Sequence, residues 1–399
     1  MHVRQRAGRA GALLALPLLL AASAPSLLPP LPDPYAAPPE GTVQILLRHS
    51  QFGAPGADDA IRRWLAANPG APKGDRAAMW HRLCSDYGVQ GAYHLAFQAC
   101  SSEAAVAPQG EADDDVAMAR ALQGVPPVRA IGSASVPLTP NKLGSRSASV
   151  TVNGFALPWF IDSGAEVSVV SQSVAERIAV RLLPGSVRVG TTTAPVSGRM
   201  AVVDRLSIGD AEIENLPVLV LPDAQLTIAD LPTIPAILGL PALVAFHRVA
   251  WLNGGETLAL GNAAPPVPAD AARLYWHEEG VGVPVSTPRG TRGAHFDSGA
   301  NASYLRAAGR TLLTRAQARS AAPHDRRIGG AGGMVNSRHD VLPRLTLRIA
   351  GAPITLTDVS IVDQDKEGAA RIGDDAIARL SALTLDFDQM RVAASPLAS

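Results

Sequence analysis

The residues best placed to do chemistry are two aspartates, each at the head of the same four-residue turn. Asp162-Ser163-Gly164-Ala165 follows Phe160-Ile161, and Asp297-Ser298-Gly299-Ala300 follows Phe296, 135 residues further on. A single Asp-Ser-Gly would predict an ordinary turn, because all three residue types favour turns. Two copies, each directly after apolar residues typical of a buried strand, instead favour a pair of functional carboxyl groups.

The surroundings of the two turns repeat as well. Ile237-Leu238-Gly239 lies 77 residues after Asp162, and Arg371-Ile372-Gly373 lies 76 residues after Asp297. Strand-like segments lie between the turn and the Gly segment in each copy: residues 205–208 and 216–220, then 344–347 and 359–362. A repeat of this length is too long for a solenoid unit. It predicts two copies of one β-rich lobe, each presenting a single aspartate.

Two carboxyl groups held about 3 Å apart cannot both ionise, so they share one proton and their pKa values separate. The ionised carboxylate can then act as general base on a water molecule, while the protonated one donates a hydrogen bond to a substrate carbonyl. This chemistry calls for no metal and no cofactor. Gly164 and Gly299 permit tight turns whose backbone N–H groups can point at the carboxylates.

The paired motifs, each followed by an apolar segment ending in Gly, resemble the aspartic proteases and most closely their retropepsin-like branch. The resemblance covers residues 128 to 392, about two thirds of the chain. It implies an all-β, bilobal fold of tandem retropepsin-like lobes in which Asp162 and Asp297 meet at a pseudo-twofold axis as the catalytic dyad. It further implies that the Ser163 and Ser298 hydroxyls lock the two turns, and that the substrate is a polypeptide.

By position in such lobes, two segments would form flaps over the substrate. These are Gly190-Thr191-Thr192-Thr193 in the first lobe and Gly329-Gly330 in the second. The stretch between Asp162 and Gly239 holds no aromatic residue, unlike the pepsin-like flap, which carries Tyr. His295 precedes the second motif; strand alternation is expected to turn it away from Asp297, in a structural role.

The N-terminus predicts a targeting segment. Arg4, Arg6 and Arg9 precede an apolar run, and Ala22-Ser23-Ala24 forms a small-x-small cleavage pattern. We therefore expect a signal peptide over residues 1–24 and a periplasmic or secreted protein, without a stable membrane span. An uncleaved membrane anchor is the alternative, because Pro25 is a poor residue after a cleavage point. Residues 25–55 are expected to form a Pro-rich linker.

Residues 56–125 show helical spacing, with Trp64 and Trp80 as packing anchors. Both cysteines of the chain, Cys84 and Cys100, fall here, and export favours a disulfide between them over two buried free thiols. They lack the compact ligand spacing of a metal site. Whether this helical region docks a partner, acts as a prosegment or serves as a spacer is left open.

The lobes are expected at residues 128–262 and 270–397, separated by a Pro-rich joint. With 36 Gly and 33 Pro, the composition suits a turn-rich β protein. Thirty-five basic and 35 acidic residues balance, and no basic run outside the N-terminus suggests nucleic-acid binding. The sequence thus predicts an exported, monomeric aspartic endopeptidase. The alternative is a non-catalytic protein that binds or scaffolds peptides with the same fold.

Overall fold

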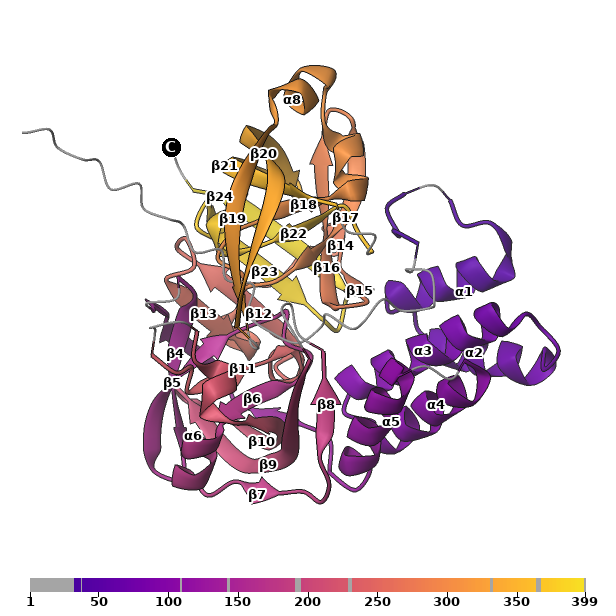
Figure 1. The fold of residues 1–399 in the computed structure, drawn as a ribbon, viewed down its shortest axis with the longest axis vertical. Helices are drawn as coiled ribbons and strands as arrows, with labels where there is room; N and C mark the ends of the chain where they lie inside the picture. Colours follow the sequence, from indigo (N-terminus) through magenta and orange to yellow (C-terminus); the bar gives the residue numbers. More distant parts are fainter. Residues whose placement is uncertain are drawn as a thin grey trace, which may run out of the picture.

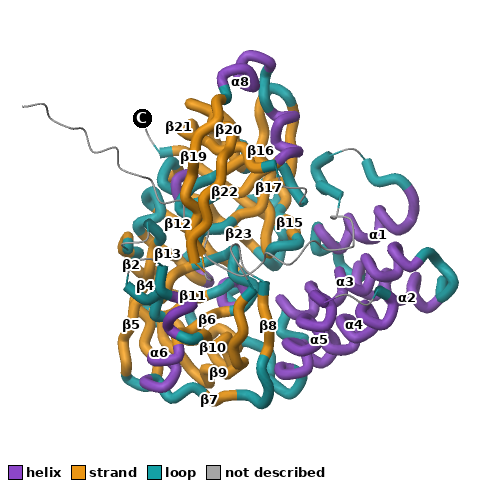
Figure 2. Tube along the Cα trace, viewed as in Figure 1, coloured by secondary structure: helices purple, strands orange, loops and turns teal. Residues whose placement is uncertain are grey.

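The computed structural model describes residues 32–36, 38–107, 110–141, 144–190, 195–228, 232–330, 333–363 and 367–397. A helical N-terminal region, in indigo and purple in Figure 1, leads into two β-rich lobes. Figure 2 shows the longer helices gathered in that region, and strands with a few short helices in both lobes. The predicted two-lobed, all-β architecture with a small helical region is confirmed. The predicted signal peptide lies outside the described residues, and none of the described helices has the length and apolar character to cross a membrane.

Five helices form the N-terminal region: α1 (Gly41–Gln51), α2 (Ala57–Ala67), α3 (Lys73–Val89), α4 (Tyr93–Val106) and α5 (Gly110–Leu122). They pack around a common core in which Ile61 and Met79 are fully buried. The prediction of a linker over residues 25–55 is wrong from Gly41 onward, because α1 lies inside it. Beyond Pro39, Val43 and Leu47 recur at helical spacing and pack against this core.

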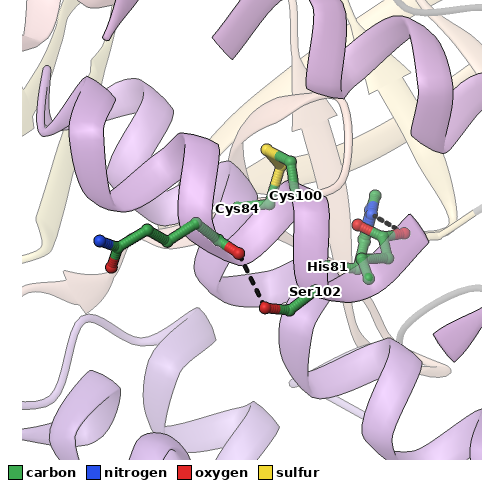
Figure 3. Close-up of a disulfide and its surroundings, with 6 residues drawn as sticks. His81, Cys84, Cys100 and Ser102 are labelled. Atoms are coloured by element: carbon green, nitrogen blue, oxygen red, sulfur yellow. Dashed lines mark hydrogen bonds and ion pairs between the residues drawn. A yellow bond between two sulfur atoms is a disulfide. The ribbon is translucent and has the colours of Figure 1, made fainter. Parts of the chain in front are cut away.

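A disulfide joins α3 to α4 (Figure 3). The Cα atoms of Cys84 and Cys100 are 4.9 Å apart. Beside it, Nδ1 of His81 on α3 hydrogen-bonds Oε1 of Glu103 on α4 at 3.0 Å. Burial acts to lower the pKa of His81, but the carboxylate of Glu103 outweighs it and raises this pKa to about 9. The helix pair is therefore held by a covalent bond and by a charge-assisted hydrogen bond.

Lobe 1 is built on a ten-stranded sheet. Its strands are β1 (Arg129–Ile131), β3 (Thr139–Pro140), β4 (Arg146–Val152), β5 (Phe155–Ile161), β6 (Ser168–Ser171), β7 (Arg181–Leu182), β8 (Val187–Val189), β9 (Val196–Ile208), β10 (Ala211–Leu221) and β11 (Ala236–Leu238). Asn153 and Gly154 form the β4–β5 turn, both with positive φ (48° and 81°), as the Asn-Gly pair predicts. Its short helices are α6 (Gln172–Arg177), η1 (Asp223–Leu226) and α7 (Leu240–Val244).

Lobe 2 is built on an eight-stranded sheet. Its strands are β15 (Tyr275–His277), β16 (Gly280–Thr287), β17 (Gly290–Phe296), β18 (Tyr304–Arg306), β19 (Ala322–Gly330), β20 (Gly333–Ile349), β21 (Ala352–Val362) and β22 (Ala370–Ile372). Its short helices are η3 (Ala307–Leu312), α8 (Arg315–Ser320) and α9 (Asp374–Ile377).

The two lobes repeat one pairing pattern. In lobe 1, β11 runs parallel to β5 and antiparallel to β6, and β6 runs parallel to β10. In lobe 2, β22 runs parallel to β17 and antiparallel to β18, and β18 runs parallel to β21. The register also agrees, because Ile237 lies opposite Phe160 just as Arg371 lies opposite His295. The internal repeat read in the sequence is therefore a structural repeat.

A third, six-stranded sheet joins the lobes. Its strands, in spatial order, are β14 (Ala272–Arg273), β24 (Arg391–Pro396), β23 (Leu380–Asp386), β12 (Arg248–Leu252), β13 (Thr257–Leu260) and β2 (Ala134–Pro137). β12 follows lobe 1 in the chain and pairs antiparallel with β23, which follows lobe 2. Trp251 of β12 packs edge-on against Phe296, with ring centroids 5.0 Å apart. One hydrophobic core consequently runs through this sheet into both lobes.

Candidate active site

Each aspartate follows an interior strand of its lobe. The backbone N–H of Asp162, after β5, donates to the Leu238 carbonyl of β11 at 3.1 Å. The N–H of Asp297, after β17, donates to the Ile372 carbonyl of β22 at 2.9 Å. Both aspartates are withdrawn from solvent, with 0% and 1% of their surfaces exposed. The two carboxyl groups therefore lie at the ends of equivalent strands, β5 and β17.

The serine after each aspartate locks the two turns together. The Ser163 hydroxyl donates to the Phe296 carbonyl and accepts from the Ser298 N–H, both at 3.0 Å. The Ser298 hydroxyl donates to the Ile161 carbonyl and accepts from the Ser163 N–H, again at 3.0 Å. Each hydroxyl therefore satisfies two buried backbone groups of the opposite lobe. We call this set of four hydrogen bonds the serine lock.

The glycine after each serine allows the opposite aspartate to approach. A Cβ atom on Gly164 would lie 2.6 Å from Cγ of Asp297, and one on Gly299 would lie 2.3 Å from Cγ of Asp162. Carbon atoms cannot approach so closely, so any side chain here would push the two carboxyl groups apart. The glycines are required by the closeness of the dyad as well as by the turn.

A second pair of serines, missed from the sequence, supports the turns. The Ser168 hydroxyl accepts from the Gly239 N–H at 3.0 Å, and the Ser303 hydroxyl accepts from the Gly373 N–H at 2.9 Å. Both serines stand six residues after their aspartate, so the aligned repeats contained the signal. These bonds tie each Gly segment to its own Asp turn.

The two carboxyl groups are solvated unequally by the protein. Oδ1 of Asp162 accepts from the Gly164 N–H (2.9 Å), whereas Oδ1 of Asp297 accepts from the Gly299 and Ala300 N–H groups (both 3.0 Å). Burial and the adjacent Asp297 carboxylate raise the pKa of Asp162 well above its usual range. Burial also raises the pKa of Asp297, but Arg371 opposes that rise. The dyad thus favours a proton on Asp162 and negative charge on Asp297.

Arg371 is a site residue that the sequence reasoning missed. Its NH1 lies 3.0 Å from Oδ2 of Asp297 and its NH2 lies 3.5 Å from Oε1 of Glu279. The side chain is 9% exposed, and its guanidinium also lies over the Tyr304 ring, 5.5 Å from the centroid. The signal was present in the repeat, because Arg371 stands where the first copy has Ile237.

A buried charged cluster lies behind Arg371. Glu279 also accepts a hydrogen bond from Arg306, a fully buried side chain. His295 approaches the same carboxylate (Nδ1–Oε2 3.6 Å) and stacks on His277, with centroids 4.8 Å apart. Burial holds the pKa of His277 down at about 3, and burial together with His277 holds that of His295 well below its usual range. Both imidazoles are therefore neutral.

The expectation that His295 faces away from Asp297 is wrong. The two residues are two positions apart on an extended strand, and side chains at that spacing lie on the same face. His295 accordingly joins the cluster that holds Asp297. His277, Glu279 and His295 could offer a metal ion three ligand atoms within 4.8 Å of one another. Glu279 is already paired with two guanidinium groups, whose charge would repel a cation, so the set is a poor metal site.

The predicted flap residues that the structure describes, Gly190, Gly329 and Gly330, lie at strand ends of β-hairpins. Gly190 follows β8, which pairs with the start of β9. Thr191, Thr192 and Thr193 lie outside the described residues. Gly329 and Gly330 end β19, where they pair with Met334 and Gly333 of β20. Contact between these residues and a substrate stays a prediction.

Two comparisons with known proteins found a similarity, one within lobe 1 and one over two thirds of the chain. A family model described as aspartyl protease matches residues 148–242, which contain the Asp162 turn and Gly239. Lobe 1 is aspartyl-protease-like. The second motif, at Asp297, lies outside the matched segment. Among solved structures, the chain is similar to basic 7S globulin from soybean, with 10% identity over 67% of this chain and 97% of that chain and a TM-score of 0.43. No curated protein matches the chain.

Proposed function

We propose that the protein is an exported aspartic endopeptidase whose catalytic residues are Asp162 and Asp297. The observation that carries this proposal is the serine lock, which holds two buried aspartates together at the junction of two like lobes. A lock of this kind stabilises the approach of two carboxyl groups that would otherwise repel each other. The aspartyl-protease match over residues 148–242 supports peptide hydrolysis as the reaction.

In the proposed reaction, the ionised carboxylate accepts a proton from a water molecule as that water attacks the carbonyl carbon of a peptide bond. The protonated carboxyl donates a hydrogen bond to the carbonyl oxygen, where negative charge develops. Collapse of the tetrahedral intermediate breaks the C–N bond, and a proton passes to the leaving amine. The two carboxyl groups together supply both the base and the acid.

Export is part of the same proposal. The N-terminal segment has the three parts of a signal peptide, and the Cys84–Cys100 bond suits an oxidising compartment. These two features support a periplasmic or secreted location.

One observation favours the second candidate, a peptide-binding protein without hydrolysis. Arg371 pairs with Oδ2 of Asp297, and its positive charge makes that carboxylate a weaker base toward water. Such a protein would bind peptides without cleaving them.

Cleavage of a denatured-protein mixture, followed from acid to neutral pH, separates the two candidates. Asp162→Asn and Asp297→Asn are each expected to abolish cleavage while leaving the fold intact. Asp388→Asn is the matched control, because Asp388 is exposed and pairs with His247 away from the dyad. Full activity in either dyad variant would refute the assignment, and a folded but inactive wild type that binds peptides would favour the second candidate.

A further inference from the structure

Arg371 is the one guanidinium that contacts the dyad among the described residues, and it does so from a position where lobe 1 is apolar. Its counterpart Ile237 belongs to a hydrophobic cluster that also holds Phe160 and Val169. The strand pairings place Arg371 against His295 and Tyr304 in the same way. The pseudo-twofold symmetry of the scaffold is therefore broken by side chains at the dyad itself.

The charges of the cluster are counted from the described groups that contact Asp297 or Arg371, and Glu367 beside His277 is left out because burial raises its pKa and favours its neutral form. β22 contributes Arg371, β18 contributes Arg306 and Tyr304, and the turn between β15 and β16 contributes Glu279. His277 and His295, from β15 and β17, are neutral. Two arginines and one glutamate leave a net charge of +1. A dyad that holds one proton carries −1 and makes the buried cluster neutral.

We propose that Arg371 is a positioning residue that stabilises the singly protonated dyad, keeping Asp297 as the general base and leaving the proton on Asp162. This inference rests on the proposed function and identifies which aspartate plays which part. The geometry supports that division. Oδ2 of Asp297 meets the guanidinium and Oδ1 meets two backbone N–H groups, and all three contacts favour the ionised form.

Loss of the Arg371 charge would make the fully protonated dyad the neutral state of the cluster, because Arg306 and Glu279 would then balance. The dyad of Arg371→Met should take up its second proton at a higher pH, by about one to three units, the usual effect of a nearby opposite charge. Arg371→Lys keeps the charge and should stay close to the wild type. Glu279→Gln leaves more positive charge beside Asp297 and should move the same proton uptake to lower pH.

The test measures proton uptake in two ways on the full chain. The first is the acid limb of the kcat/KM profile for peptide cleavage. The second is a carbon-13 NMR titration of labelled Asp carboxyl groups, with the Asp297 signal assigned from its absence in Asp297→Asn. Ile237→Met is the matched control at the mirrored position, and neither its acid limb nor its titration should move. Circular dichroism verifies that each variant is folded.

Opposite shifts in Arg371→Met and Glu279→Gln are the expected result, since a merely structural role would not reverse direction between them. An unchanged Asp297 titration in folded Arg371→Met would overturn the inference, and so would a Glu279→Gln shift to higher pH. If Arg371→Met does not fold, the Glu279→Gln and Arg371→Lys titrations decide. A wild type that cleaves nothing would refute the proposed function alone, because the NMR titration does not depend on cleavage.

Discussion

Lobe 1 and lobe 2 carry the same strands in the same register but surround their aspartates with opposite chemistry. Three paired strand positions can be compared between the lobes, on β11, β5 and β6 in lobe 1 and on β22, β17 and β18 in lobe 2. They are Ile237, Phe160 and Val169 in lobe 1, and Arg371, His295 and Tyr304 in lobe 2. The first three belong to a hydrophobic cluster, and the second three belong to a buried cluster of charged and polar side chains.

The helical region follows the same division. It meets lobe 1 through apolar side chains, because Tyr93 and Leu122 belong to the cluster that holds Phe160. It meets lobe 2 through polar groups, such as Gln51, whose Nε2 donates to Oε1 of Glu367 at 2.8 Å. Buried apolar area stabilises a fold, whereas buried charge generally does not. The comparison indicates that the apolar side chains near Asp162 add stability, whereas the charged side chains near Asp297 set the charge of the site.

The strongest test of this division places the lobe 2 residue in lobe 1. In Ile237→Arg, the new guanidinium would lack its partners, because the register puts Gly144 where lobe 2 has Glu279. An unpaired buried charge is destabilising by about 3–5 kcal/mol, which approaches the whole stability of many domains. We expect little soluble protein, measured as yield and as the urea midpoint. Ile237→Met should lose less than about 1.5 kcal/mol. Equal stability of the two variants would contradict the comparison.

Substitutions in the serine lock should destabilise the two lobes equally. Ser163→Ala leaves the Phe296 carbonyl and the Ser298 N–H unpaired, and Ser298→Ala leaves the matching two groups of lobe 1. At about 1–3 kcal/mol for each buried unpaired group, each single variant should lose about 2–6 kcal/mol in urea unfolding. The double variant should lose less than the sum, because the bonds form one network. A much larger loss in one lobe would show that the lock is not symmetric.

Reduction of the disulfide should affect lobe 1 more than lobe 2. Cys84 and Cys100 are 16 residues apart, a loop whose closure contributes about 3 kcal/mol. Loosening of α3 against α4 would disturb Tyr93, which packs into the lobe 1 cluster. Hydrogen exchange of the Cys84→Ser/Cys100→Ser variant should therefore lose protection in β8 and β9 before β19 and β20. Earlier loss of protection in β19 and β20 would show that the helical region stabilises lobe 2 more than lobe 1.

The smallest change in stability is expected for a substitution of Glu367, where the helical region meets lobe 2. Burial and Glu278 raise the pKa of this carboxyl well above its usual value of 4.5. As the pH rises past 4.5, the unfolded chain loses this proton while the folded protein keeps it, so stability falls. Glu367→Gln should remove that fall and gain stability at neutral pH, by less than the losses above. Urea unfolding at acid and neutral pH measures it, and an unchanged pH dependence would show that Glu367 is ionised in the fold.

Much of the architecture could be read from the sequence, because the repeat is long and its signals are local. The Asp-Ser-Gly turns and the Asn153-Gly154 hairpin depend on neighbours within a few residues. α1 was missed because the prolines before it dominated the composition of the segment. The orientation expected for His295 was wrong because side chains two positions apart on a strand share a face, and its structural role stays a prediction. Its true partners come from separate strands, and only the folded register brings them together.

Arg371 illustrates what sequence reasoning could not reach. The departure from Ile237 was visible, but its meaning depends on Glu279 and Arg306, which lie far away in the chain. Without those contacts, an arginine in an apolar segment reads as a surface residue. The structure buries it and gives it two carboxylate partners.

The six-stranded sheet between the lobes has a consequence for how the protein is made. Translation releases β12 long before β23, its neighbour on one side, has been synthesised. A nascent chain that already contains all of lobe 1 therefore exposes a strand edge, which is prone to wrong pairing and a suitable target for a chaperone. Asp297 and β23 are both synthesised after lobe 1, so the two aspartates can meet only late in synthesis.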